Sequence, residues 1–410
     1  MRVLFVSQVF WPDTASVAQH MWDLAEELRA GAHDVHVYSS CYPYENKREK
    51  YRRRETHRGV LIDRIVHTGF GKSSTPGRLL DFLTFNAAVL WRLIRLPRDR
   101  YHLVVSTTVP PLVSYFVALV AQWKGFRFCY WAMDLQPELA VASGMIRRGS
   151  ITERILTHVG NQIVRKADLV VALDNYMRNH VVARGAGADR VSLIPLWPVI
   201  EKTYVGSRLD NPFRQSNGMG DRIVVMYSGN HAYVHPLDTL LAAAKELSDD
   251  DRFLFVFVGG GVRKKDVTEF NESYGLRNIR QLPYEPRENI HNSLAAADLQ
   301  VVVMGEGQVG FTHPNKIYGA LFVGRPVLYI GPTPSHVEDI LASLPGNLSV
   351  RHGEVHRLAA LLREFAARPE DENHGIGSRN RLCATSSYDP VRLKTEMRKA
   401  VERLIEVSSR

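Results

Sequence analysis

Short apolar runs alternate with helix-length amphipathic segments along this sequence, and the alternation occurs twice. The first series runs from RVLFV at residues 2–6 to RVSLIP at 190–195, and the second from RIVVMYSG at 222–229 to PVLYIG at 326–331. Strands that alternate with helices form parallel sheets covered on both faces. We therefore predict an α/β chain with two doubly wound domains in series, whose ligands bind at the carboxyl ends of the strands.

The same pattern sets the expected domain boundaries. We predict a first domain over residues 1–196, a linker over 197–221, a second domain over 222–388 and a C-terminal helix over 389–410. The linker is rich in Pro, Gly, Asn and Ser and shows no clear period. With two domains, the cleft between them is the default ligand site.

Composition narrows the class of protein. A chain of 410 residues with 45% hydrophobic and 23% charged residues is an ordinary globular protein with enough apolar material for two cores. The net charge of +9 fits nucleic acid, an anionic membrane surface or phosphorylated small molecules. Three separated cysteines, Cys41, Cys129 and Cys383, predict neither a disulfide framework nor a zinc site, and favour a reducing, cytoplasmic compartment.

Two segments leave alternatives open, and neither predicts a membrane-spanning helix. The tract Lys47–Arg58 fits a solvated loop, or a basic patch that meets anionic lipid or a pyrophosphate-bearing acceptor. Leu79–Leu96 is apolar except for a narrow stripe of Asp81, Arg92 and Arg95, which fits a core helix or a helix in the membrane interface. The start, MRVLFVSQVFWPD, reads as a first strand rather than a signal peptide.

Several common catalytic motifs do not occur. The loop SQVFWPDTASVAQ after the first strand contains no glycine, which argues against a dinucleotide-dependent dehydrogenase. The sequence has no GxxxxGK[ST], HExxH or GxSxG motif. The acidic run Asp249–Asp251 precedes a strand, at the end expected to face away from a ligand, so we expect no metal there.

Three loops of the second domain favour an anionic ligand. Gly229 and Asn230 follow one strand, and Gly259–Gly261 follow the next, where glycines let backbone approach a ligand. In the third loop, Pro314 suits the first turn of a helix, whose free N–H groups favour an anion. Lys316 adds a full charge there, although a solvated helix lysine is the alternative. Loops on adjacent strands converge, so we predict a diphosphate site.

The motifs in these loops resemble a known enzyme family. The segments FVFVGGG, LAAADLQVVVM and HPNKIYGALFVGRPVL, with STTVPPL and AMDLQPEL in the first half, resemble the family-four retaining glycosyltransferases. Within that family they look like the bacterial sugar transferases of capsule, O-antigen and colanic acid assembly. The resemblance covers about residues 1–350. It implies the GT-B fold, in which two Rossmann-like domains face a central cleft, and a nucleotide-sugar donor.

The resemblance also implies roles for individual residues. Those expected to line the donor nucleotide and its diphosphate are Gly229, Asn230, Gly259, Gly260, Gly261, Arg263, Pro314, Asn315 and Lys316. Those expected on the acceptor side, in the first domain, are Ser16, Asp134 and Glu138. Lys316 and Asp134 are the expected catalytic residues; Asp134 orients the acceptor hydroxyl, caps the helix of LQPEL, or does both.

The sequence departs from the family pattern at several positions. Asn230 and His235 stand where many members have an arginine and a lysine, and Phe311 and Gly319 stand where many have two glutamates. The second of those glutamates usually holds the ribose hydroxyls. Glu306 is the nearby acid that would replace it.

These observations predict a retaining glycosyltransferase of the hexosyl or N-acetylhexosaminyl class that needs no metal or other cofactor. Its expected acceptor is a lipid-linked saccharide of bacterial surface polysaccharide assembly. The expected location is cytoplasmic and peripheral on the inner membrane face, with an anionic membrane surface as a partner and no nucleic acid. Two alternatives remain, a nucleotide-sugar epimerase on the same fold and a non-catalytic, glycosyltransferase-like subunit.

Overall fold

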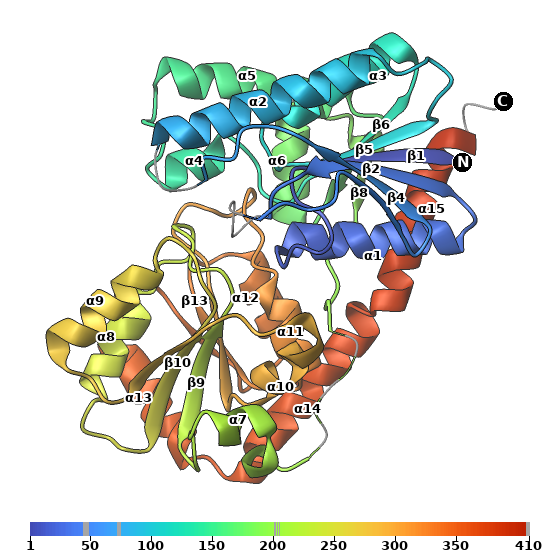
Figure 1. Cartoon of the computed structure of the whole chain (residues 1–410). Helices are drawn as coiled ribbons and strands as arrows, with labels where there is room; N and C mark the ends of the chain where they lie inside the picture. The colour runs from blue at the N-terminus through green and yellow to red at the C-terminus, as the bar shows by residue number, and fades with distance from the viewer. Residues whose placement is uncertain (44–48, 72–74, 201, 203, 205, 407–410) are drawn as a thin grey trace. The chain divides into compact units, whose positions relative to one another are not determined.

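The chain folds as two compact units (Figure 1). The computed structural model describes residues 1–43, 49–71, 75–200, 202, 204 and 206–406. The first unit comprises Met1–Leu196 and Val391–Arg410, and the second comprises Trp197–Pro390. Each unit is built around a sheet of parallel strands, so the predicted α/β class is confirmed.

The first unit contains an eight-stranded sheet in the order β3-β4-β2-β1-β5-β6-β7-β8. Its neighbours pair in parallel, except that β3 runs antiparallel to β4. Interior strands such as β5 are buried along their whole length, as expected for a sheet covered on both faces. The strands are β1 (Arg2–Val6), β2 (Asp34–Ser40), β3 (Arg54–His57), β4 (Val60–Ile65), β5 (Leu103–Thr107), β6 (Arg127–Trp131), β7 (Leu169–Ala172) and β8 (Val191–Leu193).

Helices cover both faces of this sheet. Its helical segments are α1 (Ser16–Ala30), α2 (Thr75–Ile94), α3 (Val113–Lys124), α4 (Glu138–Ala142), α5 (Ile151–Lys166), α6 (Asn175–Ala183), η1 (Ala188–Arg190) and α15 (Pro390–Glu406). Helix α1 covers one face, and α2, α3 and α5 lie together on the other (Figure 1). Helix α15 docks on α1, where Arg398 Nε lies 3.0 Å from Glu27 Oε1. The C-terminal helix therefore completes the first unit, which its sequence spacing did not indicate.

The basic tract Lys47–Arg58 contains a strand. Lys47 and Arg48 lie outside the described residues, but Arg54–His57 forms the edge strand β3. Arg54 pairs with Asp63 at 3.5 Å, and Arg58 pairs with Glu26 at 2.7 Å. The prediction of a loop was therefore wrong for this part, because cross-strand pairing with β4 orders it. Part of its charge is also balanced by acids of its own unit.

The segment Leu79–Leu96 lies largely in α2, and its predicted polar stripe is not one surface. Asp81 is buried, and its carboxylate accepts hydrogen bonds from the backbone N–H groups of Phe70 at 3.0 Å and Gly71 at 2.9 Å. Phe85 on the same side is fully buried, whereas Leu83 is 49% exposed. One side of the helix therefore belongs to the core and the other does not. Among the described helices, none is both long enough and apolar enough to cross a bilayer.

The second unit contains a six-stranded sheet in the order β11-β10-β9-β12-β13-β14. The strands are β9 (Ile223–Ser228), β10 (Phe253–Val258), β11 (Ile279–Leu282), β12 (Leu299–Val303), β13 (Val327–Ile330) and β14 (Leu348–Val350). From β9 the chain adds strands first on one side and then, from β12 on, on the other. The strand order therefore reverses between β9 and β12, where ligands of such sheets bind.

The helical segments of the second unit surround this sheet. They are η2 (Arg208–Asp210), α7 (Pro212–Ser216), α8 (Asp238–Glu246), α9 (Lys264–Tyr274), η3 (Arg287–Asn289), α10 (Ile290–Ala295), α11 (Lys316–Phe322), α12 (His336–Ala342), α13 (Val355–Ala367) and α14 (Glu370–Ser387). Asp249–Asp251 lies between α8 and β10, at the amino end of that strand, as expected.

The segment expected as a linker, 197–221, is part of the second unit rather than a free connection. Its helix α7 carries Arg214, whose side chain is 1% exposed. The guanidinium of Arg214 donates to the carbonyl oxygens of Gly220 and Ala296, each at 2.8 Å, and pairs with Asp298 at 3.1 Å. These buried contacts attach Arg214 and Gly220 to the rest of the second unit, although the composition of this stretch predicts an irregular loop.

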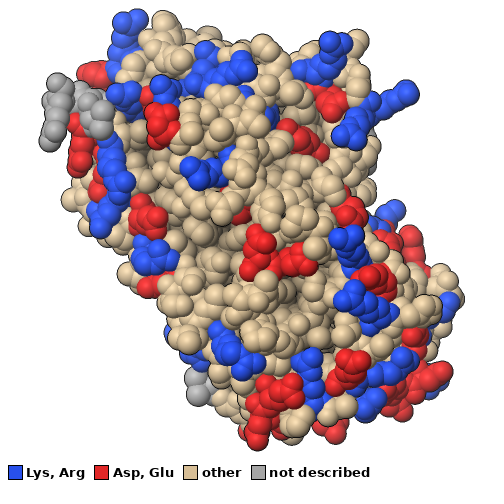
Figure 2. Space-filling view, turned by 180° about the vertical axis from the view of Figure 1, so that it is seen from behind, with Lys and Arg blue, Asp and Glu red and all other residues tan. Residues whose placement is uncertain are grey.

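Positive charge is not gathered in one place on the face shown in Figure 2. Lysine and arginine side chains there are interspersed with aspartate and glutamate side chains. On this face, therefore, the net charge of +9 does not appear as one basic patch.

Candidate active site

Three loops of the second unit meet at the point where the strand order reverses. Gly229 and Asn230 follow β9, Gly259–Gly261 follow β10, and a long loop leads from β12 to Lys316 at the start of α11. The backbone N–H of Gly305 donates to the carbonyl oxygen of Val234 at 3.0 Å, which joins the loops after β12 and β9. The structure thus brings together the loops that the sequence analysis selected for the donor.

The glycines are required by close approach as well as by backbone conformation. Gly229, Gly259 and Gly261 have φ of +129°, +123° and +127°, which side-chain-bearing residues rarely adopt. A Cβ on Gly259 would overlap the carbonyl oxygen of Gly229, and one on Gly261 would overlap the Asn230 side chain. The loops after β9 and β10 are therefore in direct contact.

Lys316 lies against the first of these loops. A Cβ on Gly229 would come within 2.7 Å of Lys316 Cε, and the ammonium lies 4.9 Å from the centre of the Tyr227 ring. The cation is therefore held at the carboxyl end of β9, the expected place for a diphosphate.

The helix behind Lys316 differs from the prediction. Helix α11 begins at Lys316 with Asn315 as its N-cap residue and has seven residues, so Pro314 precedes the helix instead of occupying its first turn. Such a short helix gives only a weak dipole. We therefore assign the positive potential here to the Lys316 charge rather than to the helix.

Two histidines beside Lys316 are held neutral. Burial, opposed by a hydrogen bond to Gly260 and reinforced by the Lys316 charge, lowers the pKa of His231 to about 4. Burial and the same charge lower the pKa of His235 well below its ordinary value. The position at which many family members carry a lysine thus carries no charge here, and Lys316 is the cation next to Gly229.

His231 also joins two donor loops. Its backbone N–H donates to the Gly260 carbonyl oxygen at 2.7 Å, and its ring Nδ1 lies 3.2 Å from the same oxygen. Its Nε2 is buried and has no hydrogen-bond partner among the described residues, as is also true of Gln308 Oε1 and Thr312 Oγ1 in the loop after β12. Buried polar atoms in proteins usually have a partner, so water or a polar ligand is expected to complete the bonding of these three. Sequence reasoning missed all three residues, because no motif includes them.

Arg263 is less available to the donor than the resemblance implies, and Phe311 and Gly319 offer it no charged side chain. The guanidinium of Arg263 pairs with Asp266 at 2.6 Å and with Asp238 at 3.3 Å, so it is already engaged within its own unit. Phe311 is 9% exposed. A Cβ on Gly319 would meet Leu294 Cδ1 at 3.4 Å, so its surroundings are apolar. Glu306 is exposed in the loop after β12 and is the acid nearest in sequence to these positions.

The expected acceptor-side residues lie near the carboxyl edge of the first sheet. Ser16 begins α1, with its Oγ 3.2 Å from His20 Nδ1. Asp134 follows β6, is half-buried, and its backbone N–H donates to Thr108 Oγ1 at 3.3 Å. The suggestion that Asp134 caps a helix was wrong, since α4 begins at Glu138 with Pro137 at its N-cap.

Glu138 is engaged in an ion-pair network. Its carboxylate lies 2.9 Å from His180 Nε2 and 3.1 Å from Arg184 Nη1. Burial acts to raise the pKa of Glu138, but the His180 hydrogen bond and the Arg184 charge outweigh it, and the pKa lies below its ordinary value. Glu138 is therefore ionised and connects α4 to α6.

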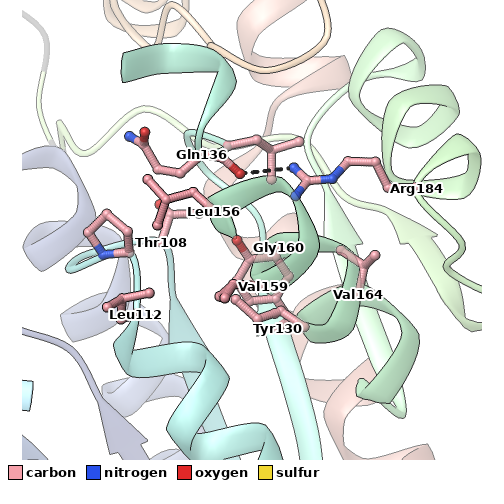
Figure 3. Close-up of a pocket in the computed structure, with 12 residues that line it drawn as sticks. Thr108, Leu112, Tyr130, Gln136, Leu156, Val159, Gly160, Val164 and Arg184 are labelled. Carbon is pink, nitrogen blue, oxygen red and sulfur yellow. Dashed lines mark hydrogen bonds between the residues drawn. The ribbon is translucent and has the colours of Figure 1, made fainter. Parts of the chain in front are cut away.

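A small pocket adjoins this network in the first unit (Figure 3). Arg184 Nη1 donates to the Gln136 carbonyl oxygen at 3.1 Å, and Nε donates to Asn161 at 2.8 Å. A Cβ on Gly160 would overlap the guanidinium, so the absence of a side chain at that point of α5 lets Arg184 pack against the helix. The lining is mostly apolar and comprises Thr108, Pro111, Leu112, Tyr130, Leu135, Gln136, Leu156, Val159, Gly160, Ile163, Val164 and Arg184. Five of these residues lie in the segments STTVPPL and AMDLQPEL, which carry the family resemblance in the first half of the chain, but the sequence analysis did not predict a pocket there.

No metal centre emerges from the described residues: they contain no group of three or more His, Cys, Asp or Glu side chains placed to bind one ion.

The chain resembles known glycosyltransferases in sequence and in fold. Residues 16–197 match the family described as the glycosyl transferase 4-like domain. Over 380 residues the chain is 21% identical to "Putative colanic acid biosynthesis glycosyl transferase WcaI" of Escherichia coli (strain K12), covering 90% of this chain and 93% of that protein. It is 23% identical over 242 residues to "Probable glycosyltransferase WbjE" of Pseudomonas aeruginosa, covering 59% of this chain and 60% of that protein.

The structural comparison agrees with the sequence comparison. The solved structure of Anabaena Alr3699/HepE in complex with UDP and glucose is similar with a TM-score of 0.73 at 16% identity, over 98% of this chain and 100% of that chain. Two Rossmann-like units with these sheet orders form the GT-B fold, as predicted. Within the chain, residues 16–197 thus match a glycosyl transferase 4-like domain, and both sequence relatives are described as glycosyltransferases.

Proposed function

We propose that this enzyme transfers a hexosyl or N-acetylhexosaminyl group from a nucleotide sugar to a hydroxyl group of a lipid-linked saccharide, with retention at the anomeric carbon. The observation that carries the proposal is the convergence of Gly229, Gly259 and Lys316 where the second sheet reverses its strand order. Retention follows from the retaining family that the motifs resemble.

The chemistry requires stabilisation of a departing diphosphate. As the bond between the anomeric carbon and the phosphate oxygen breaks, negative charge grows on that oxygen and positive charge grows on the sugar. A preorganised positive group stabilises such an oxyanion by about 3–4 kcal/mol. Lys316 is the group proposed for this role, and the glycine loops let backbone N–H groups approach the other phosphate oxygens. Asn230 and Asn315 are proposed to contact the nucleotide.

The acceptor is proposed to bind the first unit. Asp134 follows the interior strand β6 and is half-buried, so its carboxylate is suited to orient one hydroxyl. A saccharide acceptor, proposed to be lipid-linked, is supported by the E. coli relative, a putative colanic acid biosynthesis glycosyl transferase. The proposed setting is bacterial surface polysaccharide assembly at the cytoplasmic side of the inner membrane.

Lys316 supplies one positive charge for the diphosphate, and we propose that no divalent ion is needed beside it. Transfer should therefore continue in EDTA at an unchanged rate. Loss of transfer in EDTA with recovery on adding Mg²⁺ or Mn²⁺ would contradict this part of the mechanism.

A thermal-shift screen over UDP-, GDP- and dTDP-sugars tests donor binding directly. We expect one nucleotide class to raise the melting temperature of the wild type and not that of Lys316→Ala. The stabilising donor is then incubated alone and with candidate acceptors. Conversion of the sugar without an acceptor would identify an epimerase instead, and binding without any turnover would indicate a non-catalytic subunit.

A further inference from the structure

The outward side of three helices in the first unit is unusually apolar. Helices α2, α3 and α5 lie on the same face of the first sheet, with α3 packed against both others (Figure 1). Their outward sides carry large apolar side chains that no described element covers. We call this surface the outer helix face. It comprises Leu79, Leu80, Leu83, Trp91, Ile94, Leu119, Trp123, Ile151 and Ile155.

Helix α2 provides most of this surface. Leu80, Leu83, Trp91 and Ile94 are between 41% and 56% exposed, and their spacing places them on one stripe of the helix. The opposite stripe, including Phe85, is buried against the sheet. The helix is therefore apolar on two sides, and only one of them is used by the fold.

Helices α3 and α5 add further exposed apolar side chains to the outer helix face. On α3, Leu119 is 38% exposed and Trp123 is 54% exposed. On α5, Ile151 is 76% exposed and Ile155 is 58% exposed. Monomeric proteins rarely leave large contiguous apolar surfaces uncovered, and such a surface marks an interaction site.

The exposed charges beside the apolar side chains of α2 and α3 are cationic, whereas α5 carries the partly exposed acid Glu153, which accepts a hydrogen bond from the backbone N–H of Gly149. Arg95 lies over the ring of Trp91 at 3.7 Å, and Lys124 lies over the ring of Trp123 at 4.1 Å. Asp81 is the only acidic residue in the sequence of α2 and is buried, and the sequence of α3 contains none. Tryptophan, leucine and isoleucine flanked by arginine and lysine suit the boundary between anionic headgroups and acyl chains.

We propose that the outer helix face docks on an anionic lipid bilayer. The apolar side chains enter the boundary of the acyl region, while Arg95 and Lys124, beside Trp91 and Trp123, meet headgroup phosphates. The cationic rim favours this occupant over a second copy of the chain, because two such rims would repel each other. The inference rests on the proposed lipid-linked acceptor for its biological purpose, but its test measures lipid binding without any transfer reaction.

The experiment is vesicle co-sedimentation. Wild-type protein is mixed with vesicles of equal parts phosphatidylglycerol and phosphatidylcholine, or of phosphatidylcholine alone, at low and high salt. We expect binding to the anionic vesicles that weakens with salt, and much weaker binding to the neutral ones. Leu83→Ser combined with Trp91→Ser should lower the partition coefficient at least about tenfold, since both side chains are half-exposed and lose apolar contact with the lipid.

A matched control removes the same number of exposed apolar side chains elsewhere. Leu382→Ser combined with Val391→Ser changes residues that are 68% and 70% exposed, and should bind vesicles like the wild type. Melting curves and the donor thermal shift show that each variant is folded. Absent binding by the wild type, equal binding to neutral vesicles, or equal losses in both double variants would overturn the proposal. So would a wild-type dimer in light scattering that Leu83→Ser with Trp91→Ser dissociates. Failure of the proposed enzyme activity would leave the vesicle result standing.

Discussion

Replacing Lys316 removes the positive charge at the carboxyl end of β9. Two unit charges about 4 Å apart interact by about 4 kcal/mol at an effective dielectric constant of about 20. Lost oxyanion contacts of this kind reduce turnover by about 10²–10³. We therefore expect Lys316→Ala to reduce kcat about a hundredfold or more with a saturating donor.

Lys316→Ala should lower the free energy of unfolding much less than it raises the activation free energy of transfer. The contact between the Lys316 ammonium and the Tyr227 ring, 4.9 Å away, is worth about 0.5–1 kcal/mol. The melting temperature should therefore fall by only a few degrees. Lys316→Met keeps an apolar chain against Gly229 while removing the charge, so it should lose as much activity as Lys316→Ala.

The assay measures release of the nucleoside diphosphate and formation of the glycosylated acceptor. Lys265→Ala is the matched control, because Lys265 is an exposed lysine beyond the glycine loop and should leave kcat unchanged. Activity of Lys316→Met within about threefold of the wild type would refute the electrostatic argument and leave Lys316 with a packing role.

Three further predictions follow from other parts of the second unit. Gly259→Ala should abolish the donor-induced thermal shift, because its Cβ would overlap the Gly229 carbonyl and its φ is +123°; an unchanged shift would show that these loops do not bind the donor. His231 titrates near pH 6.5 when unfolded and near 4 when folded, so unfolding takes up a proton and stability falls as the pH drops between these values. His231→Gln should remove about 2 kcal/mol of the stability loss between pH 7 and pH 5, measured by denaturant melts, and an unaltered pH profile would contradict the assignment. Arg214→Ala should destabilise the second unit by about 2–4 kcal/mol, because the carbonyl oxygens of Gly220 and Ala296 lose their donor while Asp298 keeps its ion pair with Arg208, and a loss under about 1 kcal/mol would show that the network is dispensable.

The sequence was sufficient for the strands other than β3 and β14, and for the loops that follow them. Runs such as RVLFV and FLFVFV are buried on both faces, so their apolar character is continuous and easy to recognise. Gly229 and Gly259 could be selected from the sequence because a glycine after a strand lets the backbone approach a ligand closely. The convergence of these residues with Lys316 then follows from the strand order.

Other features were hidden because they depend on partners far away in the chain. Asp81 looked like a polar surface residue, but its carboxylate binds two backbone N–H groups about ten residues earlier. Arg214 lies in a stretch with no periodicity, and its partners Ala296 and Asp298 are in another part of the second unit. The strand β3 was missed because the charged tract that contains it resembles a solvated loop until β4 pairs with it.

The return of α15 to the first unit has a consequence for biosynthesis. The first unit is assembled from two stretches of chain, and the whole second unit is encoded between them. A ribosome must therefore complete the second unit before it reaches the residues of α15 that pair with Glu27. Domains generally fold as units while the chain is being made. The later-encoded unit can thus reach its native contacts on the ribosome while the earlier one still lacks a helix, and until then α1 exposes the surface that α15 will cover.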